Sequence, residues 1–493
     1  MEASPSPRSA AHHRPAAGPG DAPHVVVVGG GISGLAAAHR LQGAGARVTV
    51  LEGSGRLGGK LWAGEVGGVP VDLGAESMLA RRPEAVGLAR AVGLGDRLQS
   101  PTTATAALWS RGALRPMPKG HVMGVPGDPA ALAPSGVLTP EGLARIEEDT
   151  HLPRTEVGED VAVGRYVAQR LGREVVDRLV EPLLGGVYAG DAYQISMRAA
   201  VPQLYQAARA ERSLLAGVQE LQRRAAERPA AQGPVFAGLS GGIGTLPAAV
   251  AASLRAGGAE VRTGAEVTGL ARTPGGWRVV VTGSEGTRQL DADGVVVAVP
   301  APAAAALLVD QAPAAAAELA TVEYASMALV SLAFRRADLA TSPSGSGFLV
   351  PPVEGRHIKA ATFAGNKWGW VQAGGPDIFV VRTSLGRAGE SAVLDREDAE
   401  LVELSRTDLR EAIGLDARPV DQRVVRWHGG LPQYPVGHLE RVARVRAAVA
   451  AVPGLALCGA YQDGVGIPAC VATASSAADA LLATLATAAR PGE

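Results

Sequence analysis

Residues 24–52 read HVVVVGGGISGLAAAHRLQGAGARVTVLE. The stretch predicts a strand, a glycine-rich turn, a helix and a second strand, because a run of valines at 25–28 leads into the turn. Gly29, Gly31 and Gly34 fill the pattern G-x-G-x-x-G. In that pattern the first glycine permits the tight turn, the second lets the backbone approach a pyrophosphate, and the third lets the helix pack closely on the sheet. The stretch therefore predicts a dinucleotide-binding unit with the pyrophosphate at the helix N-terminus.

Glu52 ends the second strand, at the separation from the turn where dinucleotide-binding units carry an acid for the ribose hydroxyls. A carboxylate there favours a free ribose 2′-hydroxyl, which means either NAD or the AMP half of FAD. The alternative is a glycine-rich turn without a ligand, since the chain has 64 glycines. Strand, turn, helix, strand and acid nevertheless follow one another in the order that dinucleotide binding requires.

A second glycine pair follows at once. The sequence RLGGK at residues 56–60 is followed by VDLGAE at residues 71–76. These motifs resemble the start of the flavin amine oxidase and phytoene desaturase superfamily. The resemblance implies non-covalent FAD, with the second glycine pair beside the pyrophosphate and residues 74–77 close to the flavin ring. An ordinary turn would explain the glycines, but it would not explain the Arg and the Lys that flank them.

Composition limits the class of protein. The chain has 493 residues, which predicts two to three domains. Its 47 Lys and Arg residues balance 48 Asp and Glu residues, so a net charge of -1 gives no reason to expect nucleic acid or an anionic membrane as a partner. Cys458 and Cys470 form no CxxC pair. This spacing argues against a dithiol reductase and fits a reducing cytoplasm, where we expect the protein to be.

The first 22 residues are rich in Pro, Ala, Ser and Gly and lack the apolar core of a signal peptide. We expect them to form a disordered tail. No run of 18 apolar residues occurs in the chain, so we expect no transmembrane segment.

The chain predicts an α/β fold with three parts. Apolar residues recur at four-residue spacing across residues 160–184, a second helical run follows at 201–226, and strand-like segments lie within 327–383. We therefore expect a discontinuous Rossmann-like FAD-binding domain, a mostly helical insert and an antiparallel-sheet substrate-binding domain. The expected boundaries are 23–100, 235–310 and 425–493 for the FAD-binding domain, 101–234 for the insert and 311–424 for the substrate-binding domain.

Residues 463–468 read DGVGIP and precede a helix that we expect over about residues 469–485. In the flavin superfamily this turn and helix N-terminus lie against the flavin, where the helix dipole stabilises negative charge on the reduced ring. A terminal helix that only completes the fold is the alternative. We find no second G-x-G-x-x-G motif with a following acid, so the chain lacks the expected signature of an NAD(P)H site. Electrons must then leave the flavin by another route, and dioxygen is the simplest acceptor.

Three further segments narrow the superfamily. They are LLGGVYAGD at residues 183–191, GGIGTLP at 241–247 and PQYPVGH at 432–438. Occurring in this order around the FAD motifs, they resemble the protoporphyrinogen and coproporphyrinogen oxidase family of haem biosynthesis. The resemblance implies oxidation of a porphyrinogen to a porphyrin in three two-electron steps, each passing through FAD to dioxygen and giving hydrogen peroxide. It demands no strong general base, and the histidines show no metal-ligand spacing.

The resemblance also implies a set of binding residues, none of which is expected to be catalytic in its own right. For FAD they are Gly29, Gly30, Gly31, Ile32, Ser33, Gly34, Glu52, Arg56, Lys60, Gly74, Ala75, Glu76, Ser77, Val267, Trp427, Val465, Gly466 and Ile467. For the substrate they are Arg81, Arg82, Gly186 and Leu349. The arginine pair would bind a propionate, and a solvated pair on a loop is the alternative. Ordinary core packing is the alternative for Trp427.

The identity of the substrate is open. Where many family members have an aromatic residue this chain has Ser346, which suggests a wider cavity. We expect coproporphyrinogen III, with four propionates, over protoporphyrinogen IX, with two. Arg356, Lys359 and Lys367 are candidates for extra cations in the cavity.

Two other classes of protein share the predicted fold. A flavin amine oxidase usually lines the flavin face with aromatic residues, and the 5 Phe, 6 Trp and 7 Tyr of this chain are few for that purpose. A non-catalytic flavin-binding or porphyrin-binding protein is the other alternative. Whether a ferrochelatase makes a transient contact to receive the porphyrin is also left open.

Overall fold

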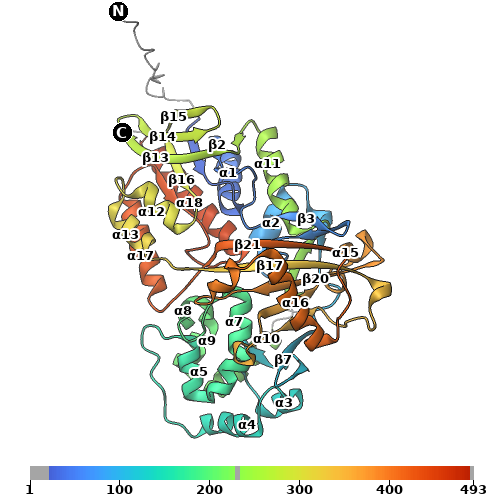
Figure 1. The fold of residues 1–493 in the computed structure, drawn as a ribbon. Helices are drawn as coiled ribbons and strands as arrows, with labels where there is room; N and C mark the ends of the chain where they lie inside the picture. The colour runs from blue at the N-terminus through green and yellow to red at the C-terminus, as the bar shows by residue number, and fades with distance from the viewer. Residues whose placement is uncertain (1–21, 228–233, 489–493) are drawn as a thin grey trace, which may run out of the picture.

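The computed structural model describes residues 22–227 and 234–488. The expected tail, residues 1–22, lies outside the described residues except for Ala22. Figure 1 shows a parallel sheet with its helices at one end of the molecule, a long second sheet in the middle and a group of helices at the other end.

The predicted strand, turn, helix and strand form β1 (His24–Val28), α1 (Ile32–Gly43) and β2 (Arg47–Leu51). They belong to a five-stranded sheet in which every pair of neighbours is parallel. The order of its strands is β12 (Glu260–Arg262), β2, β1, β16 (Gly294–Val297) and β22 (Leu455–Leu457). The predicted Rossmann-like α/β fold is therefore confirmed, and the glycine turn lies at the C-terminal end of its central strand.

The valines of β1 alternate between two core clusters, because successive side chains of a strand point to opposite faces. Val25 and Val27 belong to the cluster that contains residues of α1, α11 and α18. Val26 and Val28 belong to the cluster that contains residues of β13, β14, α12 and α13. Burial on both faces explains why β1 is a continuous apolar run. The bounds are α11 (Leu246–Ala256), α12 (Ala301–Leu308), α13 (Pro313–Ala320), α18 (Ile467–Ala488), β13 (Ala265–Thr273) and β14 (Gly276–Gly283).

A seven-stranded sheet forms the middle of the molecule. All of its neighbours are antiparallel except β18 and β7. The helix α16 (Asp398–Ile413) contacts β17, β19 and β21 of this sheet. The strand order is β21 (Asp421–Pro432), β17 (Tyr324–Arg335), β20 (Ile378–Leu385), β19 (Ile358–Phe363), β18 (Gly347–Leu349), β7 (Ala106–Ser110) and β8 (Ala113–Pro116).

The sheet draws on parts of the chain that we expected in other domains. β7 and β8 come from residues 101–234, which we expected to be mostly helical, and β21 extends past residue 425. Both edges of the sheet are thus formed by segments outside residues 324–385. The division of the chain into three domains stays a prediction.

The helical group has its own core. The four-residue apolar spacing found in the sequence places Val163, Val167, Leu171, Val175 and Leu179 inside it, each at most 1% exposed. Its helices are α3 (Pro129–Leu132), α4 (Pro140–Glu147), α5 (Val163–Leu171), α6 (Arg173–Val175), α7 (Glu181–Tyr188), α8 (Met197–Ala200), α9 (Pro202–Ala210) and α10 (Leu214–Ala226). A π-helical turn, Val176–Val180, joins α6 to α7.

The shorter elements connect these three parts. They are β3 (Ala63–Val66), β4 (Val69–Asp72), β5 (Met78–Leu79), α2 (Pro83–Ala91), β6 (Leu98–Gln99), β9 (His121–Val122), β10 (Val125–Pro126), β11 (Phe236–Leu239), β15 (Gly286–Ala292), α14 (Ala364–Lys367), α15 (Gly369–Gly374) and α17 (His438–Ala450).

The C-terminal helix α18 consists mostly of apolar residues. Among the described residues it contains the one stretch, Ile467–Thr487, whose length and mean hydropathy of 1.4 match a membrane span, and 44% of that window is buried inside the molecule. The helix packs against α1 and α2, and Leu481 lies over Gly294 at the start of β16. These are the contacts of a core helix, and such helices reach the same hydropathy.

Candidate functional site

The first glycine turn has the geometry that the motif requires. Gly29 has a φ of 108°, and a Cβ added at Gly34 would collide with the carbonyl oxygen of Gly29. Gly34 therefore permits the close contact between helix and strand. A Cβ at Gly31, by contrast, would meet no atom within 4 Å, so the backbone at Gly31 borders open space. Neither a side-chain cap nor an acidic residue occupies the N-terminus of α1, which leaves it available to an anion.

The carboxylate of Glu52 lies beside this turn. It accepts a hydrogen bond from the amide of Gly30 at 2.7 Å and two more from the amide and hydroxyl of Ser54, at 2.9 and 2.7 Å. The amide of Ala265 donates to the Glu52 carbonyl at 2.9 Å, which brings the strand that carries Val267 next to the acid. The residues predicted for the AMP half of FAD are therefore neighbours, although they come from distant parts of the chain.

The two glycine pairs lie against each other. The amide of Gly58 donates to the carbonyl of Gly30 at 2.8 Å, and a Cβ at Gly59 would stand 3.3 Å from the Cα of Gly31. The sequence predicted both turns beside the pyrophosphate, and the structure brings them to one place. Small residues on both sides leave the backbone accessible there.

Arg56 is held by two tryptophans. Its guanidinium carbon lies 4.6 Å from the ring centroid of Trp62 and 5.6 Å from that of Trp427. Burial lowers the pKa of Arg56, with the Glu52 carboxylate acting in the opposite direction. The indole of Trp427 donates to the carbonyl of Leu73 at 3.2 Å, so it lies against the segment that we predict to face the flavin.

The N-termini of α1 and α18 meet near Lys60. Burial raises the pKa of the Cys470 thiol in the first turns of α18, and the Ser33 hydroxyl and the Lys60 ammonium oppose this shift from close by. Burial lowers the pKa of Lys60. The first turns of α1 and α18 therefore lie close together, and both helix dipoles favour negative charge there. Val465 packs against the core of the helical group, whereas Ile467 and Ile32 are buried in the core cluster that contains residues of α1 and α18.

The segment 74–77 is fixed by charged side chains. The carboxylate of Glu76 accepts from the ammonium of Lys367 at 2.5 Å and from the guanidinium of Arg382 at 2.7 Å. Burial opposes ionisation of Glu76, but Lys367 and Arg382 outweigh it and lower the pKa. Ala75 is exposed and Ser77 is half-buried. The contact of Glu76 with these two cations was not expected from the sequence.

The predicted substrate residues fall into two groups. Gly186 and Leu349 are neighbours, since a Cβ at Gly186 would lie 3.8 Å from a methyl carbon of Leu349. Arg82 caps the start of α2 and pairs with Glu84 at 2.6 Å, with 42% of its side chain exposed. Arg81 is exposed and makes no ion pair among the described residues. The structure therefore places Gly186 and Leu349 next to each other, whereas Arg81 and Arg82 lie at the surface near the end of β5.

One face of the seven-stranded sheet is only half-buried, a feature that the sequence analysis missed. Leu329, Ser384, Ala360 and Leu349 stand opposite one another in register on four neighbouring strands, and all four are half-buried. Their neighbours in sequence, such as Phe348, are buried in the core under α16. The alternation of large and small residues within these strands was the available signal, but it does not identify which strands are neighbours.

The other cationic candidates are engaged within the protein. Arg356 pairs with Glu411, and its guanidinium lies 4.3 Å from the ring centroid of Trp109. Lys359 is 7% exposed and donates to the carbonyl of Gly386 at 2.6 Å. Burial, with the nearby charge of Arg387, lowers the pKa of Lys359 to about 7. These two residues are poor candidates for free cations in a cavity.

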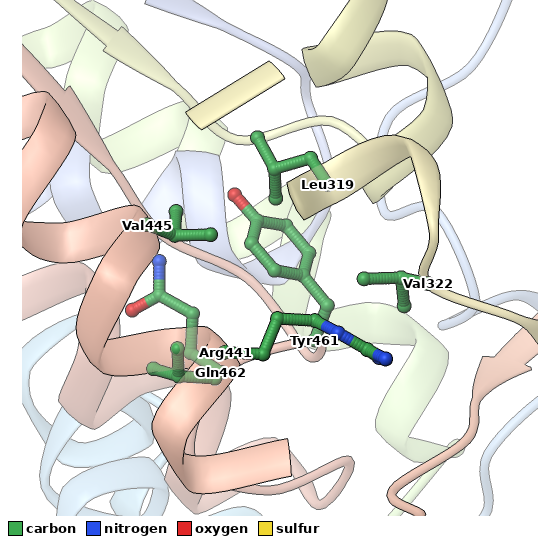
Figure 2. Close-up of a pocket in the computed structure, with 7 residues that line it drawn as sticks. Leu319, Val322, Arg441, Val445, Tyr461 and Gln462 are labelled. Carbon is green, nitrogen blue, oxygen red and sulfur yellow. The ribbon is translucent and has the colours of Figure 1, made fainter. Parts of the chain in front are cut away.

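A small pocket lies away from these residues. Figure 2 shows Tyr461 and Gln462 beside Leu319, Val322, Arg441 and Val445, between α13 and α17. Its volume of about 10 Å³ is that of a single water molecule and too small for an organic substrate. No group of three or more His, Cys, Asp or Glu suited to a metal ion occurs within residues 22–227 and 234–488.

The comparisons with known proteins agree with this geometry. The model of the flavin-containing amine oxidoreductase family matches residues 32–482. The coproporphyrinogen III oxidase of Mycobacterium tuberculosis is 39% identical to the chain over 463 residues, which cover 93% of this chain and 97% of that one. The chain belongs to the porphyrinogen oxidases of this flavoprotein family. It is a flavin-dependent oxidoreductase, and the prediction of FAD is confirmed.

Two further similar proteins carry the name of protoporphyrinogen oxidase. The protoporphyrinogen oxidase of Bos taurus is 30% identical over 489 residues, covering 93% of this chain and 98% of that one. A crystal structure from Exiguobacterium sp. 255-15, whose assignment as a protoporphyrinogen oxidase is provisional, superposes with a TM-score of 0.81 at 32% identity and covers 94% of this chain and 99% of that one. The individual FAD and substrate contacts of this chain stay predictions.

We expect Gly31→Val to fold but to lose FAD. The protein itself leaves space for a side chain at Gly31, so only a bound pyrophosphate would conflict with it. The FAD content after purification, read from visible absorbance, should fall to about a tenth of the wild-type value or less.

Gly34→Val is the matched comparison, because its side chain would strike the backbone of Gly29. This variant should lower the melting temperature of the protein even when FAD is supplied in excess. A yellow, fully loaded Gly31→Val protein would contradict the assignment of this turn.

Lys359 provides a test by pH. Its amine releases a proton near pH 7 in the folded chain but keeps it to about pH 10.5 when unfolded. The unfolded state therefore binds more protons between these values, and raising the pH by one unit within this range favours folding by about 1.4 kcal/mol at this site. Lys359→Met should remove this gain, measured as the free energy of unfolding in urea from pH 7 to pH 10.

The exposed Lys119 provides the control, since Lys119→Met should leave the pH dependence unchanged. Parallel pH profiles for the wild type and Lys359→Met would show that the amine stays charged in the folded protein.

Proposed function

We propose that this enzyme oxidises coproporphyrinogen III to coproporphyrin III, with FAD as cofactor and dioxygen as acceptor, in haem biosynthesis. The observation that carries the proposal is the 39% identity to a coproporphyrinogen III oxidase over nearly the whole of both chains. The contact between Gly186 and Leu349 supports it, because these residues were assigned to the substrate from separate segments and are neighbours in space.

The described residues fit FAD. The space over Gly31 and the free helix N-terminus suit a pyrophosphate, and the carboxylate of Glu52 suits the ribose. We expect the flavin to be held without a covalent bond. Bound FAD supplies the acceptor for hydride from a meso carbon of the porphyrinogen, and reoxidation by dioxygen yields hydrogen peroxide.

The half-buried face of the seven-stranded sheet suits the large, mostly apolar macrocycle of a porphyrinogen. The side chains of Leu329, Ser384, Ala360 and Leu349 are short or aliphatic, and Gly186 adds no side chain opposite Leu349. We propose that this face positions the ring and that Arg81 and Arg82 bind a propionate at its edge. The residues of the face include no carboxylate or imidazole, which agrees with a reaction that needs no strong general base.

The partners and location follow from the proposed reaction. Oxidation of coproporphyrinogen supplies coproporphyrin, which an iron-inserting enzyme would consume, so a transient contact with a ferrochelatase is part of the proposal. We place the enzyme in the cytoplasm, because both cysteines are free and buried.

Protoporphyrinogen IX is the second candidate substrate. The relationship to the Bos taurus protoporphyrinogen oxidase favours it, although the identity of 30% is lower than to the coproporphyrinogen III oxidase. An amine oxidase has less support, because the half-buried sheet face carries no aromatic residue in the row from Leu329 to Leu349. A non-catalytic binding protein has less support, because the relatives similar over nearly the whole chain are oxidases.

The decisive experiment offers coproporphyrinogen III and protoporphyrinogen IX separately to the FAD-loaded protein in air. Porphyrin fluorescence, corrected for autoxidation, should give a kcat/KM about tenfold higher for coproporphyrinogen III, because the chain is 39% identical to a coproporphyrinogen III oxidase and 30% identical to the protoporphyrinogen oxidase. A higher value for protoporphyrinogen IX would identify a protoporphyrinogen oxidase instead. Fluorescence no faster than the blank, with no peroxide formed, would leave a non-catalytic binding protein.

Arg82→Ala should raise the KM for coproporphyrinogen about tenfold, through loss of a charged hydrogen bond to a propionate. The FAD content should stay at the wild-type level. Arg90→Ala is the matched control, since Arg90 is exposed near the other end of α2. A KM that is unchanged by Arg82→Ala would remove this residue from the substrate site.

A further inference from the structure

Glu76 is a half-buried acid that forms ion pairs with two cations from the C-terminal half of the chain. Its side chain is 15% exposed, and those of Lys367 and Arg382 are 17% and 8% exposed. Lys367 ends α14, whereas Arg382 lies within β20 of the seven-stranded sheet. The three charges therefore connect the segment 74–77 to the sheet with little screening by water.

Arg382 also holds the backbone of the same segment. One of its terminal nitrogens donates to the Glu76 carboxylate at 2.7 Å, and the other donates to the carbonyl of Gly74 at 2.8 Å. A planar guanidinium can bridge two acceptors in this way, and an ammonium cannot keep the same geometry. The position of Gly74 relative to β20 is thus fixed by one side chain.

The opposite side of Gly74 is equally crowded. The amide of Ala75 donates to the carbonyl of Lys60 at 3.1 Å, and a Cβ at Gly74 would stand 3.2 Å from the ring of Trp427. Any shift of this segment away from Arg382 would therefore disturb the predicted FAD residues on its other side.

The register of β20 relates Arg382 to the half-buried face. Residues two apart on a strand point to the same side, so Arg382 shares a face with Ser384. Ser384 stands opposite Leu329 on one neighbouring strand and Ala360 on the other. A single strand thus carries a residue of the proposed substrate face and the residue that anchors the segment predicted to face the flavin.

We propose that Arg382 is a positioning residue, which sets the distance between the flavin-facing segment 74–77 and the half-buried sheet face. Lys367 completes the neutralisation of Glu76 and keeps its carboxylate in place. The inference rests on the proposed function for its kinetic consequence, because hydride transfer requires the substrate ring and the flavin to be held at one separation.

The test compares Arg382→Lys and Arg382→Met with a matched variant, Arg387→Met. Arg387 is 7% exposed, follows the same strand and donates to the carbonyl of Val350 at 2.9 Å, without contacting residues 74–77. Each FAD-loaded protein is measured for melting temperature, FAD content, the visible flavin spectrum and reduction potential, and kcat and KM for coproporphyrinogen III.

We expect kcat to fall about tenfold or more in Arg382→Met, and by less in Arg382→Lys, with KM changed no more than about threefold. The flavin spectrum or potential should shift in both variants. Arg387→Met should lose thermal stability and keep the wild-type kcat and flavin spectrum. Glu76→Gln combined with Arg382→Met should be no slower than Arg382→Met alone, because both changes break the same contact.

Wild-type kcat and an unshifted flavin spectrum in Arg382→Met would overturn the inference, as would an equal loss of kcat in Arg387→Met. If Arg382→Met does not fold, the same comparison with Arg382→Lys decides. If the wild type oxidises neither porphyrinogen, the proposed function fails, but the spectrum and potential of the bound flavin still report whether Arg382 positions it.

Discussion

The close contact between α1 and the turn after β1 is the constraint on which the rest of the structure depends. A side chain at Gly34 would strike the carbonyl of Gly29, so helix and strand can approach only because this position has none. The N-terminus of α1 at Gly31 therefore lies beside Gly58, and the carboxylate of Glu52, which follows β2, accepts a hydrogen bond from the amide of Gly30 in the same turn. The helix α18 then packs on α1 and brings a second helix N-terminus to the same place. The geometry of the predicted cofactor site thus depends on the short distance between α1 and the turn after β1.

How much of the structure could be predicted from the sequence depends on how far apart along the chain the interacting residues lie. The unit of β1, α1 and β2 was predicted correctly, because its pattern of valines, glycines and a terminal acid is contained in residues 24–52. The helical spacing at 160–184 was equally local. For the seven-stranded sheet, the sequence predicted an antiparallel sheet but not the order of its strands. β7 pairs with β18 across some 240 residues, and the sequence of neither strand indicates which strand it pairs with. For the same reason the row of half-buried residues from Leu329 to Leu349 could not be assembled from the sequence.

Charged residues were the hardest part of the site to predict. The sequence offered Arg356, Lys359 and Lys367 as cations for a substrate, but each has a partner in the structure: Glu411, the carbonyl of Gly386 and Glu76, respectively. A charged side chain is long, and its partner is chosen by tertiary packing rather than by neighbouring residues. Arg382 was not considered, because a single arginine within an apolar strand carries no motif. Resemblance to a family locates backbone turns well, since glycines mark them, whereas it does not specify the ion pairs that hold those turns.

The order of strands in the two sheets has a consequence for synthesis of the chain. The parallel sheet places β22, at Leu455–Leu457, beside β16 and adds it after most of the protein has left the ribosome. The larger sheet likewise holds β7 unpaired on one side until β18 is made. Each sheet lacks at least one strand until late in synthesis, so the nascent protein carries unpaired strand edges until β21 and β22 are made. Loss of the last forty residues would remove β22 and α18 together, and leave the valines of β16 paired with β1 on one side and without a neighbouring strand on the other.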